Sequence, residues 1–305
     1  MNVTSLLNAL PGSVAQGLIW GIMAVGVYIT FRVLDVADLT VDGTMCTGGA
    51  VFVMMLISDH GLVLSMFAAV CAGMLAGMVT GIFHTIMGIP AILSGILTQL
   101  ALYSANLKIM GKANQALNVG KYQLLVSLRY IRGVPFYQNS IFVTAVFIII
   151  VIALLYWFFG TELGCSLRAT GCNANMSRAQ GINTNVAKVL GLMISNGLVA
   201  LASALLSQYQ GFADVNMGRG AIVIGLAAVI IGEAIFGKVF RNFALKLLAV
   251  VLGSIIYYIV LQIVIWLGID TDLLKMLSAI IVAIFLAVPY WKSRYFAKPV
   301  KRGGD

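Results

Sequence analysis

Two acidic side chains, Asp38 and Asp42, lie four residues apart between two apolar runs of the sequence. Ionisable groups at membrane depth are costly, and they often mark a path for ions or solutes. At this spacing the two carboxylates share one face of a helix, where they would bind a coupling cation. They would equally suit a solvated position at the start of a helix, where acids complement the helix dipole. The residues leave both interpretations open.

Other polar side chains also fall inside apolar stretches, where they are costly and often functional. Asn106, Glu233 and Gln262 belong to this group, and we expect Glu233 to form a structural ion pair near Lys238 and Arg241. The candidates for the path are Asp38, Asp42, Gln99, Asn196, Gln208 and Asn216.

The hydropathy of the chain places these residues in a membrane. Sixty-one per cent of the residues are hydrophobic and ten per cent are charged, whereas soluble domains carry about 25% charged residues. Lipid offers no partner for stray backbone groups, so the spans must be helical. We predict an all-α, polytopic integral membrane bundle that forms a single domain, 1–305, with about nine (eight to ten) transmembrane helices. The predicted spans are 12–31, 44–58, 62–84, 90–107, 139–160, 187–209, 219–237, 244–267 and 273–291.

The distribution of Lys and Arg predicts the orientation, because these residues favour the cytoplasmic side. The basic tail after Trp291 is predicted to be cytoplasmic, and counting back places the polar loop 161–187 inside and the N-terminus outside. The same count places 108–138 outside, although this loop contains five basic residues and no acid. Either an extra re-entrant segment exists there or the loop has an external role, and we favour the external role.

Two short motifs indicate an internal repeat. Residues 37–41 read ADLTV and residues 213–217 read ADVNM, and each precedes a glycine-rich apolar helix. The predicted topology puts the first motif inside and the second outside, as in an inverted repeat, which in transporters places the path near the midplane. Chance similarity of a short motif is the alternative. Glycines at four-residue spacing predict close helix packing at Gly17, Gly21, Gly73, Gly77 and Gly81.

The region from Gly164 to Gly237 contains the most specific motifs. They are LGCSLRATG, NANMSRAQGINTN, ALLSQYQG, ADVNMGRG and GLAAVIIGE. This order resembles the permease subunits of bacterial ABC importers for branched-chain amino acids and for ribose or galactosides. The segment ADLTVDGTM near the N-terminus matches more loosely, and length and hydropathy fit over the whole chain. Within this group, the chain is most similar to permeases paired with tryptophan- or tyrosine-type binding proteins.

The resemblance implies a multi-pass permease of the bacterial cytoplasmic (inner) membrane rather than an enzyme. Two permease chains, expected to be a homodimer, would form the path for a small polar solute such as an amino acid. An extracytoplasmic binding protein would deliver the solute. ATP and Mg would bind to separate cytoplasmic ATPase subunits, because Gly120-Lys121 in this chain is followed by Tyr122 and does not complete a phosphate loop. No cofactor is expected in this chain.

The resemblance also implies that the polar loop contains a coupling helix, roughly Gly171 to Gln180, which would sit in a groove of the ATPase. Asn173 suits a helix start, Met176 offers an adaptable apolar contact and Gly181 suits a helix end. The two arginines of the loop are expected to pair with acids or backbone carbonyls of the partner. The candidate coupling residues are Arg168, Gly171, Asn173, Met176, Arg178 and Gly181.

The external loop is a candidate docking surface for the acidic face of a binding protein. Its candidate residues are Lys112, Lys121, Arg129 and Arg132.

Two other classes of function are the alternatives. An ion-coupled secondary transporter would use Asp38, Asp42 or Glu233 for the coupling cation. A membrane enzyme would need a polar catalytic cluster, and the sequence has no paired His, Cys–His or HExxH arrangement. Cys165 and Cys172 lack a zinc spacing, so neither a metal site nor a disulfide is expected, and the basic net charge does not imply nucleic acid.

Overall fold

The computed structural model describes residues 3–131, 135 and 138–268, together with isolated residues between 273 and 287. The first half begins with α1 (Val3–Tyr28), which continues as the π-helical turn η1 (Ile29–Val33). There follow α2 (Thr40–Ile57), α3 (Leu62–Thr85), α4 (Ala91–Met110) and the short strand β1 (Asn114–Ala116).

The second half begins with the 3₁₀ turn η2 (Leu128–Ile131) and α5 (Ser140–Gly160). Two short helices, α6 (Glu162–Cys172) and α7 (Ala174–Ala179), precede the long helix α8 (Thr184–Gln210). The chain then forms β2 (Phe212–Asp214), α9 (Ala221–Phe236) and α10 (Phe243–Trp266). β1 and β2 pair antiparallel, with Gln115 opposite Ala213.

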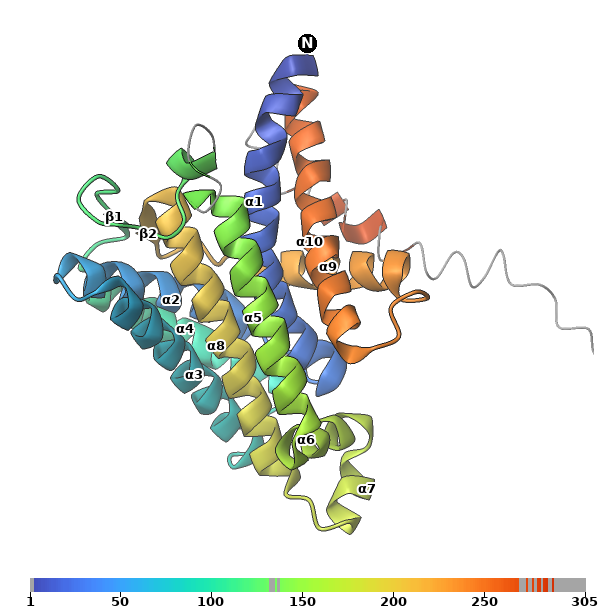
Figure 1. Cartoon of the computed structure of the whole chain (residues 1–305). Helices are drawn as coiled ribbons and strands as arrows, with labels where there is room; N and C mark the ends of the chain where they lie inside the picture. The colour runs from blue at the N-terminus through green and yellow to red at the C-terminus, as the bar shows by residue number, and fades with distance from the viewer. Residues whose placement is uncertain are drawn as a thin grey trace, which may run out of the picture.

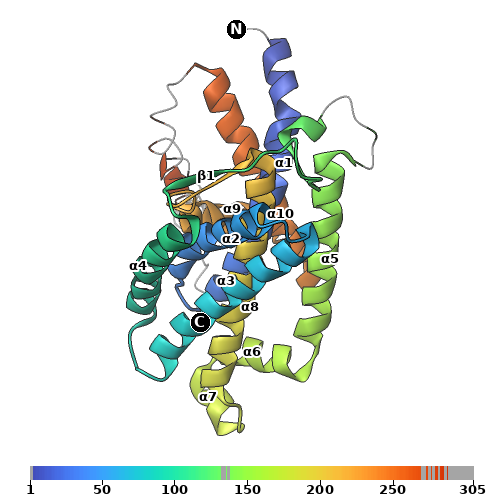
Figure 2. The ribbon, with the colours of Figure 1, turned by 90° about the vertical axis from the view of Figure 1, so that its left-hand side faces the viewer.

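Helix α8 runs through the middle of the bundle, and α3 packs along it (Figures 1 and 2). Gly73 and Gly77 of α3 make this approach close, because an added Cβ at either position would collide with the carbonyl oxygen of Asn196 or Leu192 in α8. Small residues permit such contacts between helices in lipid. The predicted packing role of this glycine series is confirmed.

Helices α1 and α10 form a second close pair (Figure 1). A Cβ at Gly17 would lie 2.8 Å from the Cα of Ile255, and one at Gly21 would lie 3.1 Å from Cγ1 of Val251. Ser254 also donates a hydrogen bond of 2.8 Å to the carbonyl of Gly17. The two glycine series therefore hold two different helix pairs, α3 with α8 and α1 with α10. The two pairs are connected because α1 and α8 pack against each other.

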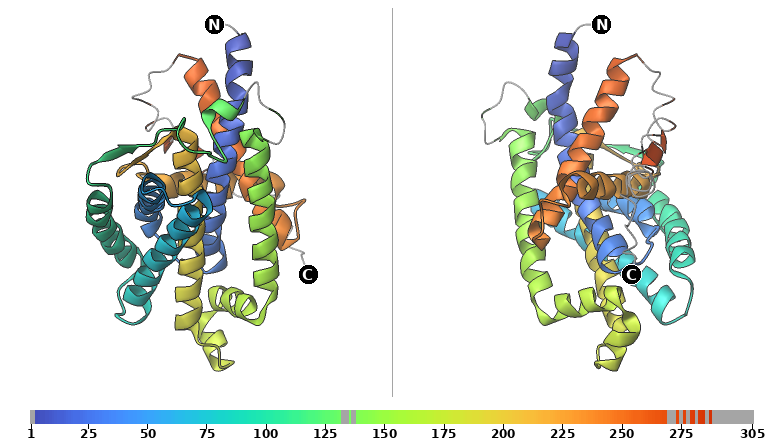
Figure 3. Two further views of the ribbon diagram at one scale, coloured as in Figure 1. Left: turned by 60° about the vertical axis from the view of Figure 1, so that its left-hand side comes forward. Right: turned by 90° about the vertical axis from the view of Figure 1, so that its right-hand side faces the viewer.

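Two helices, α2 and α9, are strongly tilted against α1 and α8 (Figures 1 and 3). Both follow a long central helix, and the first residue of each, Thr40 or Ala221, is buried. The N-terminus of the chain and the β1–β2 ribbon lie at one end of the molecule, whereas α6 and α7 lie at the other (Figure 1). The predicted external loop and the predicted coupling loop therefore occupy opposite ends.

Six helices of the described part are long and apolar enough to cross a membrane, namely α1 with η1, α2, α3, α5, α8 and α10. The predicted total of about nine transmembrane helices is not confirmed: α9 is shorter, α4 is not among the six, and most of 273–291 lies outside the described residues. Helix α4 has sufficient length but carries Gln99, Ser104 and Asn106. Polar residues in a helix of this length are typical of a wall that faces water or polar solute.

Candidate functional site

The coupling loop forms two short helices, each begun by a side-chain cap. Thr161 accepts a hydrogen bond of 3.3 Å from the backbone N–H of Gly164 at the start of α6. Asn173 accepts one of 3.0 Å from the N–H of Met176 at the start of α7, so its predicted N-cap role is confirmed. The expected helix from Gly171 to Gln180 was drawn too long at both ends, because Gly171 belongs to α6 and α7 spans only Ala174–Ala179.

The end of α7 matches the expectation from residue types. Gly181 adopts φ +81°, a left-handed conformation that glycine accepts without strain. Its backbone N–H donates to the carbonyl of Arg178 at 3.0 Å. Met176 lies on the outer face of this helix with 63% of its side chain exposed. Helix α7 therefore presents an apolar, adaptable side chain to whatever lies below the bundle.

Helix α6 is seated on the turn η1 at the end of α1. An added Cβ at Gly171 would collide with the carbonyl oxygen of Val33, so the two backbones touch. Beside this contact, Leu34 and Leu167 pack around Gly191 of α8. The sequence predicted Gly171 as a coupling residue but gave no sign of η1, because the π-turn depends on tertiary packing. A movement of α6 would push on the ends of both α1 and α8.

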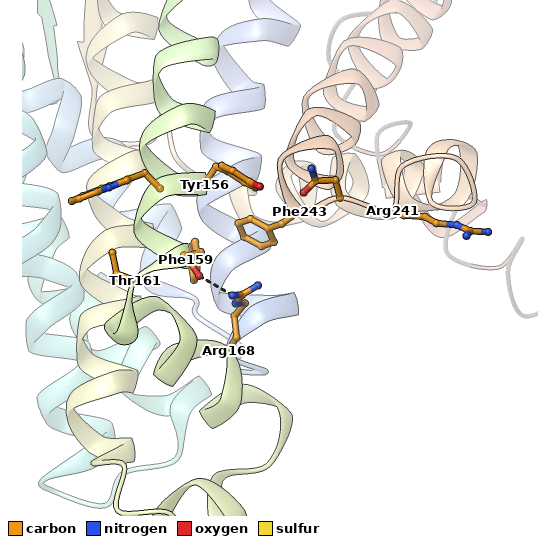
Figure 4. Close-up of a pocket in the computed structure, with 9 residues that line it drawn as sticks. Tyr156, Phe159, Thr161, Arg168, Arg241 and Phe243 are labelled. Atoms are coloured by element: carbon orange, nitrogen blue, oxygen red, sulfur yellow. Dashed lines mark hydrogen bonds between the residues drawn. The ribbon is translucent and has the colours of Figure 1, made fainter.

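Arg168 connects α6 to two further helices (Figure 4). Its Nη2 donates a hydrogen bond of 2.8 Å to the carbonyl of Phe159 at the end of α5. Its guanidinium also lies 5.7 Å from the ring centroid of Phe243 at the start of α10. These groups line a cavity of about 630 Å³ that also includes Tyr156 and Arg241. In Figure 4 the side chain of Arg241 points away from Arg168.

The second arginine of the loop also has a partner within the chain. Nε of Arg178 donates 2.8 Å to Oγ1 of Thr184, the first residue of α8. We expected Arg168 and Arg178 to pair with a partner protein, whereas both side chains are engaged inside the permease. These interactions connect α6 to α5 and α10, and α7 to α8.

Asp38 and Asn196 form a buried polar network between α2 and α8. Oδ1 of Asp38 accepts a hydrogen bond of 2.9 Å from the N–H of Thr40. Its Oδ2 accepts one of 2.7 Å from Nδ2 of Asn196. The side-chain oxygen of Asn196 accepts a hydrogen bond of 2.6 Å from the hydroxyl of Thr44. The side-chain NH₂ of Asn196 also donates to the carbonyl of Leu192. Buried polar groups paired in this way hold helices together, so these two path candidates lie in an internal network.

Asp42 joins the start of α9 to α2. Its two oxygens accept hydrogen bonds of 3.0 Å each from the N–H groups of Gly220 and Ile222. A carboxylate at a helix N-terminus satisfies unpaired donors and complements the dipole. Asp38 precedes α2 and Asp42 lies in its first turn, so the two acids do not share a helix face. The structure supports acids at helix starts, but it corrects the expectation that both are solvated, because Asp38 is buried.

Next to Asp42 lies a cavity of about 360 Å³ between α2, α4 and the segment before α9. Two predicted path residues, Asp42 and Gln99, line it. Gln208 is elsewhere: it is buried, and its oxygen accepts 3.1 Å from the N–H of Leu125 in the external loop. Asn216 is exposed before α9. Sequence reasoning did not connect three further lining residues with a path, namely Tyr103, Asn106 and Arg219.

The basic loop lies beside the β1–β2 ribbon at the end of the molecule opposite to α7. Lys112, Lys121 and Arg129 are exposed, and Arg132 lies outside the described residues. Nζ of Lys121 is 3.5 Å from Oδ1 of Asp59 and 3.3 Å from the hydroxyl of Tyr122. The hydrogen bond that Lys121 donates to Tyr122, followed by the charge of Asp59, raises the pKa of Lys121.

Glu233 forms the structural ion pair that we predicted, but with another partner. Its Oε1 is 3.0 Å from Nε of Arg32, whereas we expected Lys238 or Arg241. Arg32 belongs to η1, which the sequence did not bring near α9. Through this pair α9 contacts η1, the turn on which α6 is seated.

These features define a membrane permease fold, and comparisons with known proteins agree. The family described as "Branched-chain amino acid transport system / permease component" matches residues 10–288, and the chain belongs to this family. The tyrosine transport system permease protein of Clostridioides difficile (strain R20291) is 39% identical over 92% of this chain and 91% of its own length. The uncharacterized protein RP368 of Rickettsia prowazekii (strain Madrid E) is 36% identical over 92% and 98%.

A solved structure shares the fold at low sequence identity. PsaBC from Streptococcus pneumoniae in complex with Fab superposes with a TM-score of 0.56 and 15% identity, over 97% of this chain and 99% of that chain. By its family, the chain is a non-enzymatic, multi-pass permease subunit of an ABC importer. This result confirms the family that the motifs between Gly164 and Gly237 predicted.

Proposed function

We propose that this permease imports an amino acid, using ATP hydrolysed by separate cytoplasmic subunits that bind ATP and Mg. The observation that carries the proposal is the seating of α6 on η1 at Gly171 and Val33, with Met176 of α7 exposed beyond it. The amino-acid class rests on the relative named for tyrosine transport. The ATPase would hold α7, so that its closure moves α6 against the bundle.

The contacts of α6 supply a route for this movement. Arg168 ties α6 to the end of α5 and the start of α10, and Gly171 touches η1 at the end of α1. Arg178 ties α7 to α8 through Thr184. A rigid displacement of the two short helices would therefore reach four long helices at once. Alternating access by tilting of packed helices needs this kind of shared attachment.

The proposed bundle is an inverted repeat. Asp38 accepts a hydrogen bond of 2.9 Å from the N–H of Thr40 before α2, and Asp214 accepts one of 2.7 Å from the N–H of Asn216 before α9. The same turn thus precedes the two tilted helices. Glycine-rich contacts join α3 to α8 and α1 to α10, which is the pairing expected when two halves exchange partners. Asp42 would then lie where the halves meet, as in other transporters.

The remaining partners follow from the two ends of the molecule. The end that carries α7 would face the cytoplasm of the cell, as would the basic segment after Trp291 by its charge, and the N-terminus would face outward. Lys112, Lys121, Arg129 and Arg132 would contact an acidic surface of the binding protein. A second copy of the chain would complete the path in a homodimer.

Reconstitution in proteoliposomes tests this proposal. The permease, its ATPase and its binding protein are assembled, and uptake of radiolabelled L-tyrosine, L-tryptophan and L-leucine is followed with ATP inside. The proposal expects uptake that requires ATP and the binding protein. Uptake by the permease alone, on a proton or sodium gradient without ATP, would instead identify the ion-coupled secondary transporter, in which Asp38, Asp42 or Glu233 binds the cation.

A further inference from the structure

We propose that the cavity between α2, α4 and the start of α9 is a transient binding site for the carboxylate and the apolar side chain of an amino acid during translocation. Among the described residues that line it are Asp42, Gln99, Tyr103, Asn106 and Arg219. This inference rests on the proposed function and adds to it the residues that the solute contacts inside the membrane.

The first observation is an unpaired amide at the inner end of the cavity. Asn106 is fully buried, with 0% of its surface exposed. Among the residues that the structure describes, neither its Nδ2 nor its Oδ1 has a hydrogen-bond partner. Burying such a group without a partner costs free energy, so native proteins nearly always satisfy it. A solute with both donors and acceptors would satisfy the two atoms.

The second observation is the charge of the cavity. The two carboxylate oxygens of Asp42 accept hydrogen bonds from the N–H groups of Gly220 and Ile222. The start of α9 therefore offsets the negative charge of Asp42. In the described part of the chain, Arg219 makes no side-chain hydrogen bond or ion pair. A guanidinium forms two parallel hydrogen bonds with a carboxylate. The exposed guanidinium of Arg219 is therefore available to an anionic group of the solute.

The third observation is the shape of the cavity. Its volume of about 360 Å³ lies at the lower end of the range for small-molecule sites. Leu100 is 64% exposed and Tyr103 is 44% exposed, whereas Asn106 is buried, so the cavity opens past two apolar side chains and ends at an amide. Leu100, Tyr103 and Val215 would contact the side chain of the solute. A carboxylate joined to an ammonium group and an apolar side chain fits these walls.

The location also suits a solute path. Helix α4 has the length of a membrane span but is too polar to count among the six apolar ones. The cavity lies where α2 and α9 begin, next to the Asp42 contact that joins the proposed halves. Transporters bind their solutes at such helix ends. Binding here would be weak, because selection by the binding protein makes tight binding in the path unnecessary.

Substitutions at the two ends of the cavity test the inference in the reconstituted complex. Arg219→Gln should lower the uptake of radiolabelled L-tyrosine at least tenfold, while ATPase stimulation by the binding protein changes less than twofold. Arg219→Lys should retain part of the uptake. Asn106→Leu removes an unpaired buried amide, so it should raise the melting temperature of the permease while lowering uptake. Lys108→Gln is the matched control, because it removes one positive charge from α4 outside the cavity.

A labelling experiment tests for the carboxylate without the binding protein. Leu100→Cys is introduced into a variant in which Cys71, Cys165 and Cys172 are Ser, and alkylation by a maleimide is timed. Millimolar L-tyrosine should slow the reaction at least threefold, and tyramine, which lacks the carboxylate, should not. Equal effects of the two compounds, or no effect of either, would overturn the inference.

The two proposals fail in different ways. If the wild-type complex takes up none of the three amino acids with ATP, the proposed function is wrong, and the inference is wrong with it. If the wild-type complex transports L-tyrosine and both Arg219→Gln and Asn106→Leu transport it equally well, only the inference is overturned.

Discussion

Asp42 accepts a hydrogen bond of 3.0 Å from the backbone N–H of Gly220, although the two residues are 178 positions apart. This bond joins the first turn of α2 to the start of α9, and a second bond from Ile222 reinforces it. The two tilted helices therefore meet end to end inside the bundle. Any movement that opens a path between them must carry this contact along or break it.

Replacing Asp42 by Asn should destabilise the permease by about 1.5–3 kcal/mol, because hydrogen bonds to a charged acceptor contribute about that amount. The Asn side chain has one acceptor oxygen for two N–H donors, and its NH₂ faces a donor. Thermal unfolding of the permease in nanodiscs would measure the loss. Asp35→Asn is the control, because Asp35 is exposed and its φ of +54° suits Asn. Equal melting temperatures for the two variants would contradict a connecting role for Asp42.

Gly171→Ala should separate α6 from η1, because the new Cβ would collide with the carbonyl of Val33. Overpacking of this kind costs about 1–3 kcal/mol. We expect the complex to hydrolyse ATP with at least a fivefold drop in solute moved per ATP. Gly160→Ala is the matched control, because a Cβ there has no atom within 4 Å among the described residues. If both variants moved as much solute per ATP as the wild type, the contact between α6 and η1 would have no part in coupling.

A matched pair of proline substitutions tests whether α7 must be helical. Ala174 is the first residue of α7 and follows the extended Asn173, so Pro is tolerated there. Ser177→Pro instead removes the bond of 3.0 Å from its N–H to the carbonyl of Asn173. We expect Ala174→Pro to retain ATP-driven uptake and Ser177→Pro to lose at least nine-tenths of it. Co-purification of the ATPase would show whether assembly or force transfer is lost.

Charge reversal in the external loop should weaken the productive contact with the binding protein. Lys112→Glu combined with Arg129→Glu, both exposed, should raise by about tenfold the concentration of binding protein that half-maximally stimulates the ATPase. The shift should shrink at high salt, since screening reduces the attraction that is lost. Lys238→Glu, on the turn after α9, is the control. Stimulation that stays unchanged at low salt would rule out this docking surface.

The family resemblance implied a helix in the coupling loop, and residue types agreed with its start and its end. The acceptor side chain of Asn173 and the conformational freedom of Gly181 define the two ends of α7, and both matched the structure. Such signals are readable from sequence because caps and helix ends involve neighbours within four residues. The family motifs likewise lie in one continuous stretch, so the class of protein was predictable.

The partners of Arg168 and the walls of the cavity could not be read in this way. Phe243 lies 75 positions after Arg168, and its contact depends on how α10 packs against α5. Arg219 and Asn106 come together only once α4 is placed beside the segment before α9. A hydropathy pattern gives the depth of a residue but not the rotation of its helix. Asn106 was recognised as a polar residue at membrane depth, and only the fold shows that its amide is unpaired.

The central claim is that force from ATP hydrolysis enters the bundle through the exposed face of α7. The most direct test compares Met176→Glu with Met176→Leu, because the side chain is 63% exposed and neither change disturbs the fold. ATP-driven uptake of radiolabelled amino acid should persist in Met176→Leu and fall at least tenfold in Met176→Glu, with the ATPase detached or uncoupled. Wild-type assembly and uptake in Met176→Glu would contradict the account.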